Sequence, residues 1–297
     1  MTWPLSCVRA NESLAKHTSF RIGGPAEWFA EPTTVEELAA VLQEASARHL
    51  PITVLGGGTN SLASDRGVRG LVLHLGRGFQ TIERLPAGED GTVRVRCGAA
   101  LTTQRLVSLA AQEGWAGLDV LAGLPGQVGG AVSMNAQGIG SFVDSVTLAA
   151  FDGSVRQIGR DALSFKYRDA SLPPGIVTDV VLRFPTAPPD EASASIQKVL
   201  ERRNCTQEVR LPSAGCAFRN PPGEHAGRLI DQAGLKGSRI GDALVSPQHA
   251  NFIVNLGSAT CDDVLSLMEH IQRRVLERFG VRLEPELRVM GQARKTA

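Results

Sequence analysis

Apolar residues recur at helical spacing in five stretches of the chain. Between residues 33 and 50 the spacing brings four of them onto one face, namely Leu38, Val41, Leu42 and Ala45. Thr34 and Glu37 at the start have the spacing of a capping box. The sequence therefore predicts an amphipathic helix that begins after Thr34. The same spacing predicts four further helices, at residues 102–114, 194–204, 225–234 and 260–280.

Short runs rich in β-branched and apolar residues predict strands between these helices. They are PITVL, TVRVRCG, IVTDVVLRF, AGCAFRN, DALVS, FIVNL and the terminal LEPELRVMG. Helices and strands follow one another without a regular strand-helix-strand rhythm, which is typical of an α+β protein. The segment PTAPPDEAS, residues 185–193, is rich in proline and small residues, so we expect a linker and the main domain boundary there.

Two glycine-rich segments interrupt these patterns. The strand PITVL runs directly into GGGTN, residues 56–60, where successive backbone N–H groups at a turn can hold phosphate oxygens. A simple tight turn explains GGGTN equally well, and no lysine completes a P-loop. The second segment, residues 117–140, has no periodicity, and its glycines let the main chain approach a bulky ligand. Together the two segments favour a phosphate-bearing cofactor gripped by backbone groups.

The composition and charge exclude several classes of partner. The chain has 297 residues, of which 42% are hydrophobic, which is enough for two or three domains. Lys and Arg (31) nearly balance Asp and Glu (30), so the net charge of +1 predicts no surface for nucleic acid or an anionic membrane. The first residues lack a signal-peptide pattern, and no apolar run approaches about 20 residues. We therefore expect a cytoplasmic protein without membrane insertion and without an obligatory protein partner.

The candidate reactive side chains are few. The five cysteines form no CxxC pair and the six histidines show no metal-ligand spacing, so neither a disulfide framework nor a metal site is expected. Cys216, in PSAGCAFRNPPG, is either buried filler or a reactive thiol. Tyr167, the single tyrosine, precedes Arg168, which can equally form a surface ion pair. Strand alternation places Glu284 and Glu286 on one face, usually the solvated one.

Seven segments, taken in order, resemble the UDP-N-acetylenolpyruvoylglucosamine reductase family, flavoenzymes that complete UDP-N-acetylmuramic acid for peptidoglycan synthesis. They are HTSFRIGGPA, LGGGTNSL, LAGLPGQVGGAVSMNAQGIG, FKYRDASL, PSAGCAFRNP, RLIDQAGLKGSRIGDALVSPQHANFIVNLGSAT and VLERFGVRLEPELRVMG, and they span almost the entire chain. Because Tyr167 is the single tyrosine and no inserted segment is present, the chain resembles the shorter subclass, which lacks a tyrosine-bearing loop over the nucleotide.

The resemblance implies an α+β fold with a two-part FAD-binding domain of the vanillyl-alcohol oxidase type and a C-terminal α/β substrate-binding domain. The expected bounds are 1–78 and 79–187 for the two FAD-binding parts and 188–297 for the substrate-binding domain. The FAD contacts implied by the match lie in the two glycine-rich segments, at Gly56, Gly57, Gly58, Thr59, Asn60, Ser61, Gly123, Pro125, Gly126, Gly129, Gly130 and Ser133.

The family's chemistry is an NADPH-dependent reduction of UDP-N-acetylglucosamine enolpyruvate to UDP-N-acetylmuramate. In the family, NADPH reduces FAD, hydride passes from flavin N5 to C3 of the enolpyruvyl group, and a proton reaches C2. The match gives Arg168 and Glu286 the task of stabilising charge on the substrate. Most members donate the proton from a serine, whereas this chain has Cys216 at that position, and we expect its thiol to donate. A neighbouring Arg168 would favour thiolate, and burial and Glu286 would oppose it.

The match also places Tyr167, Arg219 and Asn220 at the nucleotide or its phosphates. Two rival hypotheses stay open. Cys216 with His225 or His249 as its base would make a cysteine hydrolase or transferase, although the glycine-rich segments would then have no role. A different oxidase activity on the same flavin fold is the second rival, and the C-terminal motifs count against it.

Overall fold

The chain forms two compact units in the computed structural model, which describes residues 3–88, 90–206 and 211–292. The first unit consists of Met1–Arg9, Phe29–Gly57 and Leu71–Arg203, and the second of Ala10–Trp28, Gly58–Gly70 and Asn204–Ala297. The boundary passes through the first glycine-rich segment, between Gly57 and Gly58. Three strands of a four-stranded sheet with the order β1-β2-β5-β3 also run through unit boundaries. Its strands are β1 (Val8–Ser13), β2 (Pro25–Ala30), β3 (Ile52–Val54) and β5 (Val68–Leu73).

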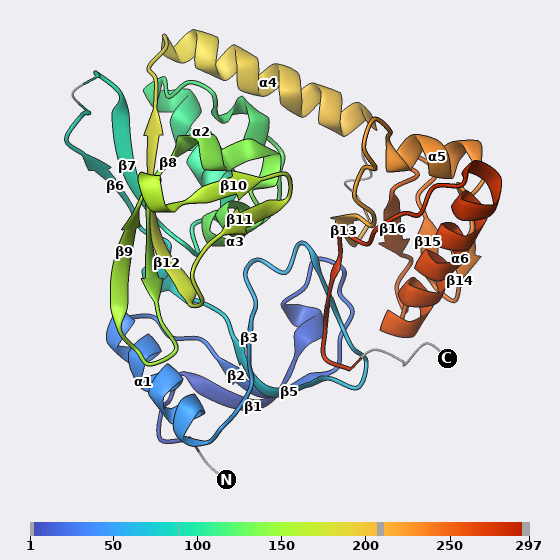
Figure 1. Cartoon of the computed structure of the whole chain (residues 1–297), viewed down its shortest axis with the longest axis horizontal. Helices are drawn as coiled ribbons and strands as arrows, with labels where there is room; N and C mark the ends of the chain where they lie inside the picture. The colour runs from blue at the N-terminus through green and yellow to red at the C-terminus, as the bar shows by residue number, and fades with distance from the viewer. Residues whose placement is uncertain (1–2, 89, 207–210, 293–297) are drawn as a thin grey trace. The chain divides into compact units, whose positions relative to one another are not determined.

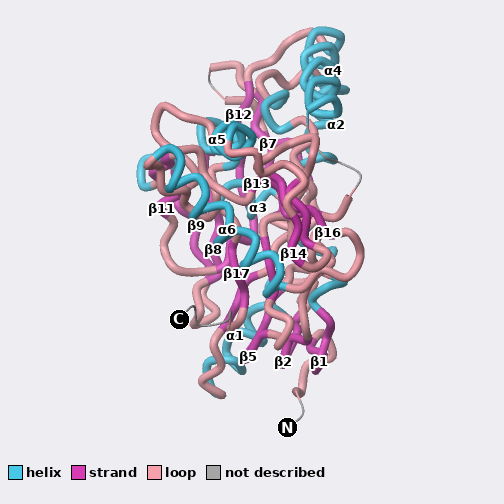
Figure 2. The backbone as a smooth tube through the Cα atoms, turned by 90° about the vertical axis from the view of Figure 1, so that its right-hand side faces the viewer, coloured by secondary structure: helices cyan, strands magenta, loops and turns pink. Residues whose placement is uncertain are grey.

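An antiparallel sheet of five strands is the centre of the first unit (Figure 1). Its order is β6-β7-β12-β8-β9, with β6 (Ile82–Leu85), β7 (Val93–Gly98), β8 (Val143–Ala149), β9 (Val155–Gly159) and β12 (Ile176–Phe184). Helices α2 (Thr103–Glu113) and α4 (Pro189–Thr206) lie side by side, as Figures 1 and 2 agree. The hydroxyl of Ser193 on α4 donates a hydrogen bond to Ala111 O on α2, at 3.3 Å.

Helix α1 (Val35–Ala47) forms where the apolar spacing predicts it, and its four predicted apolar residues are buried. The Thr34 hydroxyl accepts a hydrogen bond from Glu37 N at 3.2 Å and caps the helix. The Glu37 carboxylate accepts a hydrogen bond from Thr33 N at 2.7 Å. In the expected capping box this bond would come from Thr34 N, so the donor is the residue before the N-cap. Helix α2 likewise ends as predicted, at Gly114 with φ 69°, a left-handed conformation that suits glycine.

The second unit packs two helices against a sheet of order β13-β16-β15-β14. The strands are β13 (Ser213–Cys216), β14 (Arg239–Ile240), β15 (Ala243–Val245) and β16 (Phe252–Asn255), and the helices are α5 (Ala226–Gln232) and α6 (Cys261–Phe279). The core of the unit contains Ile230, Val264, Leu267 and Ile271, all about fully buried. Strand β17 (Arg288–Met290) pairs in parallel with β4 (Ser61–Ala63), so the end of the chain is tied to the segment that follows GGGTN.

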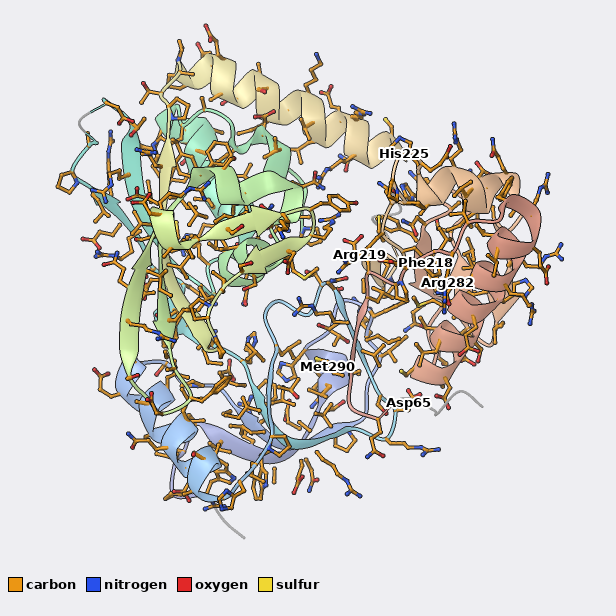
Figure 3. The ribbon with its side chains drawn as sticks, viewed as in Figure 1. Asp65, Phe218, Arg219, His225, Arg282 and Met290 are labelled. Atoms are coloured by element: carbon orange, nitrogen blue, oxygen red, sulfur yellow. The ribbon has the colours of Figure 1, made fainter. Side chains whose placement is uncertain are left out.

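Helix α6 begins with a full capping box and an additional carboxylate. Thr260 and Asp263 exchange the two bonds of the box. Asp65, labelled in Figure 3, accepts hydrogen bonds from Cys261 N at 3.0 Å and Asp262 N at 3.3 Å. Met290 lies close to Asp65 because its carbonyl accepts from Ser64 N at 2.9 Å. The loop between β4 and β5 therefore holds the start of the longest helix of this unit.

Three predictions about elements are wrong. The predicted strand AGCAFRN ends early, because β13 covers only Ser213–Cys216. Residues 189–193 of the expected linker form the first turns of α4, because a proline is well tolerated at the first helical position, where no helical N–H bond is lost. The terminal strand LEPELRVMG is shorter than predicted, since β17 starts at Arg288 and Glu284 and Glu286 precede it. None of the helices in the described ranges is long and apolar enough to cross a membrane.

Candidate active site

The two glycine-rich segments meet backbone to backbone in the first unit. A Cβ added to Gly57 would lie 3.1 Å from the Cα atom of Gly126, so side chains at this contact would separate the segments. Thr103 N at the start of α2 donates to Gly126 O at 3.0 Å, which fixes the second segment. The structure thus brings together two stretches that are about 70 residues apart in the sequence. Close backbone approach explains the glycines at this contact.

Gly130, in helix α3 (Val128–Ser133), faces open space, because an added Cβ would meet nothing within 4 Å. Two other glycines of these segments have close neighbours. A Cβ on Gly129 would lie 2.8 Å from the Ala99 Cβ, and one on Gly56 would meet the Gln127 side chain at 3.6 Å. The bare backbone at Gly130 lets a large ligand approach the main chain, which fits the predicted FAD contact there.

The remaining residues of the predicted FAD set have differing surroundings. Gly123, with φ 71°, and Pro125 are exposed, and the Ser133 hydroxyl donates to Gly129 O at 2.8 Å within α3. Gly58 has φ 65° and packs against the carbonyl of His17, a place that no larger residue fits. Thr59 is half-buried. Gly58 therefore makes the tight turn that the sequence allows at GGGTN, while Gly57 contacts the second glycine-rich segment.

Asn60 and Ser61 connect the first glycine-rich segment to the C-terminal strand of the second unit. The Asn60 amide donates to Glu286 O at 3.2 Å, and Asn60 O accepts from Arg288 N at 3.0 Å. Ser61 opens β4 opposite Arg288. Glu286 is therefore held by the segment that the sequence assigns to the cofactor.

Tyr167 and Arg168 form the tip of a hairpin in the first unit, between β10 (Ser164–Lys166) and β11 (Asp169–Ser171). Arg168 has φ 55°, a left-handed conformation that is uncommon outside glycine and asparagine. Its guanidinium carbon lies 5.9 Å from the centre of the Tyr167 ring, and the Tyr167 side chain is 62% exposed. Asn135 in the second glycine-rich segment donates to Lys166 O at 2.7 Å and so holds the hairpin next to its tip.

Cys216 ends strand β13 and is half-buried, unlike Cys97 and Cys261. Burial raises the pKa of each of those two thiols to about 12, as expected for inert filler. Gly215, with φ 75°, precedes Cys216 at a shift in the register between β13 and β16. This irregularity changes the course of the backbone next to Cys216, the residue that the sequence predicts to be catalytic.

The segment after Cys216 runs antiparallel to the segment that contains Glu286. Phe218 forms a bridge with Pro285, Glu286 N donates to Ala217 O at 2.8 Å, and Arg219 N donates to Glu284 O at 2.9 Å. Figure 3 shows Phe218 and Arg219 along this segment. The structure therefore joins the backbones of two predicted catalytic residues, Cys216 and Glu286, through a single intervening residue.

The predicted nucleotide contacts of the second unit differ in their local role. The Arg219 Nε atom is buried and has no hydrogen-bond partner among the described residues, which leaves it a donor for a ligand. The Asn220 side chain accepts from Ala226 N at 3.0 Å at the start of α5. One of its two polar atoms is therefore already used by the protein.

The two histidines of the hydrolase hypothesis have other surroundings than a catalytic base requires. His249 Nδ1 accepts from Asn251 N at 3.3 Å, its ring lies edge-on to Phe252 at 4.6 Å, and burial lowers its pKa. His225 precedes α5 and is exposed (Figure 3). In the described ranges, no group of three acidic, cysteine or histidine side chains is arranged to hold a metal ion.

Three residues hold backbone segments of the candidate site by hydrogen bonds, and the sequence predicts no role for them. They are Ser19, whose hydroxyl donates to Ser213 O at 2.6 Å, Asn135 and Asn251. All three lie in stretches that resemble the family, HTSFRIGGPA, LAGLPGQVGGAVSMNAQGIG and SPQHANF. Their presence in such stretches was a signal, but the backbone groups they bind are distant in the sequence and could not be predicted.

Comparison with known proteins gives consistent results. Residues 26–158 match the model of a FAD binding domain, and residues 207–290 match that of the C-terminal domain of UDP-N-acetylenolpyruvoylglucosamine reductase. The reductase 2 of Symbiobacterium thermophilum is 43% identical over 96% of this chain and 92% of its own. The reductase of Syntrophotalea carbinolica is 43% identical over 97% and 96%.

A solved structure also matches over nearly the whole length. The crystal structure of UDP-N-acetylenolpyruvylglucosamine reductase from Thermus caldophilus has a TM-score of 0.80 and 40% identity, and the match covers 95% of this chain and 99% of that chain. The expected α+β fold, with an FAD-binding domain followed by the C-terminal domain of the reductases, is confirmed. These matches identify an FAD-containing oxidoreductase. The chain therefore belongs to the UDP-N-acetylenolpyruvoylglucosamine reductase family.

Proposed function

We propose that this protein reduces UDP-N-acetylglucosamine enolpyruvate to UDP-N-acetylmuramate with NADPH, and thereby serves peptidoglycan precursor synthesis in the cytoplasm. Relatives that match over almost their entire length are UDP-N-acetylenolpyruvoylglucosamine reductases, which supports this substrate. The observation that carries the proposal is the antiparallel pairing that ties Cys216 to Glu286 through Ala217. A proton donor and a charged partner on adjacent segments fit an addition of hydrogen to a polarised double bond.

The glycine-rich segments hold the cofactor in this proposal. Gly130 presents open backbone, while Gly57 and Gly126 pack against each other. Side chains would fill this space, so the segments fit FAD bound chiefly by main-chain groups. FAD held there would supply the redox chemistry, which is the transfer of hydride between NADPH and the enolpyruvyl group.

Three side chains of the protein complete the reduction. The Arg168 guanidinium stabilises the negative charge that develops on the substrate carboxylate, and Glu286, as a protonated acid, donates a hydrogen bond to the same group. The Cys216 thiol gives its proton to C2, and the resulting thiolate takes a proton from water before the next turnover. The partial exposure of Cys216 allows that exchange with solvent.

The nucleotide is assigned to the residues that the resemblance implies. Tyr167, Arg219 and Asn220 contact the uridine diphosphate, and the buried Nε of Arg219 supplies a donor for a phosphate oxygen. In the same proposal, residues 1–78 and 79–187 form the two FAD-binding parts and residues 188–297 the substrate-binding domain.

A visible spectrum of the purified protein tests the proposal. We expect a yellow protein whose flavin absorbance is lost on anaerobic addition of NADPH and restored by UDP-N-acetylglucosamine enolpyruvate. A colourless protein that binds no added FAD would favour the cysteine hydrolase instead. A flavin that NADPH reduces but only oxygen reoxidises would favour a different oxidase activity.

A further inference from the structure

We propose that Asn251 is a positioning residue that sets the place of Cys216, and that this placement controls proton delivery to the substrate. The inference rests on the proposed function, because it assigns the step that Cys216 performs. Asn251 lies in the turn before β16, is 3% exposed and belongs to the second unit, as Cys216 does. Its hydrogen bonds to the two residues after Cys216 go to backbone groups, so its effect on the thiol passes through the backbone.

The Asn251 side chain binds both polar groups of one residue, Phe218. Its Oδ1 accepts from Phe218 N at 3.0 Å, and its Nδ2 donates to Phe218 O at 2.8 Å. The main-chain carbonyl of Asn251 accepts from Ala217 N at 2.8 Å. Three hydrogen bonds from a single residue therefore hold the two residues that directly follow Cys216.

This arrangement replaces a strand partner that the sheet does not provide. The ladder between β13 and β16 ends at the pair of Cys216 and Phe252, after a shift in register. Phe218 is 1% exposed, and a buried peptide group must find partners for its N–H and C=O. The amide of Asn251 has one donor and one acceptor at the spacing of a strand's own backbone, so it extends the ladder past its end.

The other edge of the same segment carries Glu286. Glu286 N donates to Ala217 O at 2.8 Å and Arg219 N donates to Glu284 O at 2.9 Å. The segment from Cys216 to Arg219 thus lies between Asn251 on one edge and the Glu286 segment on the other. Loss of the Asn251 bonds would let Phe218 shift, and that shift would move Cys216 relative to Glu286.

The substitution Asn251→Asp tests this role because it changes hydrogen bonding with little change of shape. An ionised carboxylate still accepts from Phe218 N but cannot donate to Phe218 O, whereas a protonated carboxyl can do both. Burial raises the pKa of a carboxyl group, so the protonated form returns as the pH falls. We expect flavin reoxidation by the enolpyruvyl nucleotide to slow roughly tenfold at about pH 8.5 and to recover towards the wild-type rate at about pH 6. Flavin reduction by NADPH should stay within about twofold of wild type at both pH values.

Other titrating groups near Asn251 do not produce this pattern. His249 contacts Asn251 N directly, and burial, with Lys236 adding to the effect, keeps its pKa below the usual value, but His249 is present in both proteins. Cys216 and Glu286 also face the segment, but they are present in both proteins. The quantity to compare is therefore the ratio of variant to wild-type rate at each pH, measured by anaerobic stopped-flow absorbance.

Asn255→Asp is the matched control. Asn255 lies in β16, is 2% exposed, and uses its amide in the same way, donating to Phe20 O at 3.0 Å and accepting from Gly257 N at 2.8 Å. The Asn255→Asp variant should lose a similar amount of folding free energy. Neither flavin reduction nor flavin reoxidation should be slowed selectively in it. Asn251→Ser, which removes both hydrogen bonds of the amide to Phe218, provides a second variant if Asn251→Asp folds poorly. It should show the selective slowing of reoxidation without recovery at low pH.

The outcomes separate the two proposals. Wild-type protein whose reduced flavin is not reoxidised by the nucleotide would overturn the proposed function and this inference with it. Normal wild-type turnover with equal slowing of both half-reactions in Asn251→Asp, or with unchanged reoxidation in both Asn251 variants, would overturn the inference alone. Selective slowing that recovers at low pH in Asn251→Asp, and that is absent from Asn255→Asp, would support it.

Discussion

Replacing Gly130 by alanine should stabilise the apoprotein and weaken its binding of FAD. Gly130 lies inside helix α3, its φ is not left-handed, and an added Cβ would meet nothing within 4 Å. Alanine in a helix interior is favoured over glycine by about 0.5–1 kcal/mol because the unfolded chain loses less freedom. The free energy of unfolding without cofactor should therefore rise by about that amount. The test is specific because the same substitution should raise the stability of the apoprotein and lower its affinity for FAD.

The weaker binding follows from the same open space. If that space holds the cofactor, a methyl group placed in it must displace the ligand or shift the backbone. Overpacking of one or two carbon atoms costs about 1–3 kcal/mol, which corresponds to a roughly 5- to 150-fold rise in the dissociation constant of FAD. Quenching of flavin fluorescence during titration of apoprotein measures that constant, and urea denaturation measures the stability.

Gly159→Ala supplies the control. Gly159 ends β9 in the same unit, its φ is −76°, and an added Cβ there also meets nothing within 4 Å, but it lies outside both glycine-rich segments. FAD affinity should be unchanged in this variant. Wild-type affinity in Gly130→Ala, with the expected gain in stability, would show that the open face of α3 is not the cofactor cradle. A loss of stability would instead contradict the local geometry.

Three further results are expected. Cys216→Ser should keep substantial turnover, and Cys216→Ala should lose product formation while NADPH still bleaches the flavin; equal loss of both half-reactions in the alanine variant would refute the thiol as donor. Asp65→Ala should lower the free energy of unfolding by about 1 kcal/mol in urea, because α6 loses two N-terminal hydrogen bonds but keeps the Thr260 cap. Asp179→Asn should stabilise the protein at neutral pH. Burial raises the pKa of Asp179 above its unfolded value, so ionisation disfavours the folded state and stability falls as the pH rises through the folded pKa. The gain should vanish below about pH 3.5, where both states are protonated, and a constant gain across the pH range would contradict this cause.

Local patterns were enough to predict most helices of this chain but not its sheets. Thr34 and Gly114 delimit their helices as the cap rules require, because capping depends on residues three or four positions apart. The prediction of a linker at Pro189 is wrong because proline is compatible with both a linker and a first helical turn, and composition does not separate the two. The bridge of Phe218 with Pro285 joins residues far apart in sequence, and no local rule predicts which segments pair.

In the candidate site, too, the sequence predicts which residues take part but not what holds them in place. The identities of Cys216, Arg168 and Glu286 were read from matching segments, and the glycines from their density. What holds these groups is a set of asparagine amides bound to distant backbone, with Asn135 at the hairpin of Arg168, Asn60 at Glu286 and Asn251 beside Cys216. An asparagine side chain can satisfy a peptide N–H and C=O where a ladder stops, so it allows irregular backbone to stay fixed at a site. Sequence alone marks such an asparagine as a turn or cap residue, because its partner is defined only once the chain has folded. The three amides should therefore be less replaceable by aspartate or alanine than their residue type suggests, and each should affect the step performed by the catalytic residue that it holds.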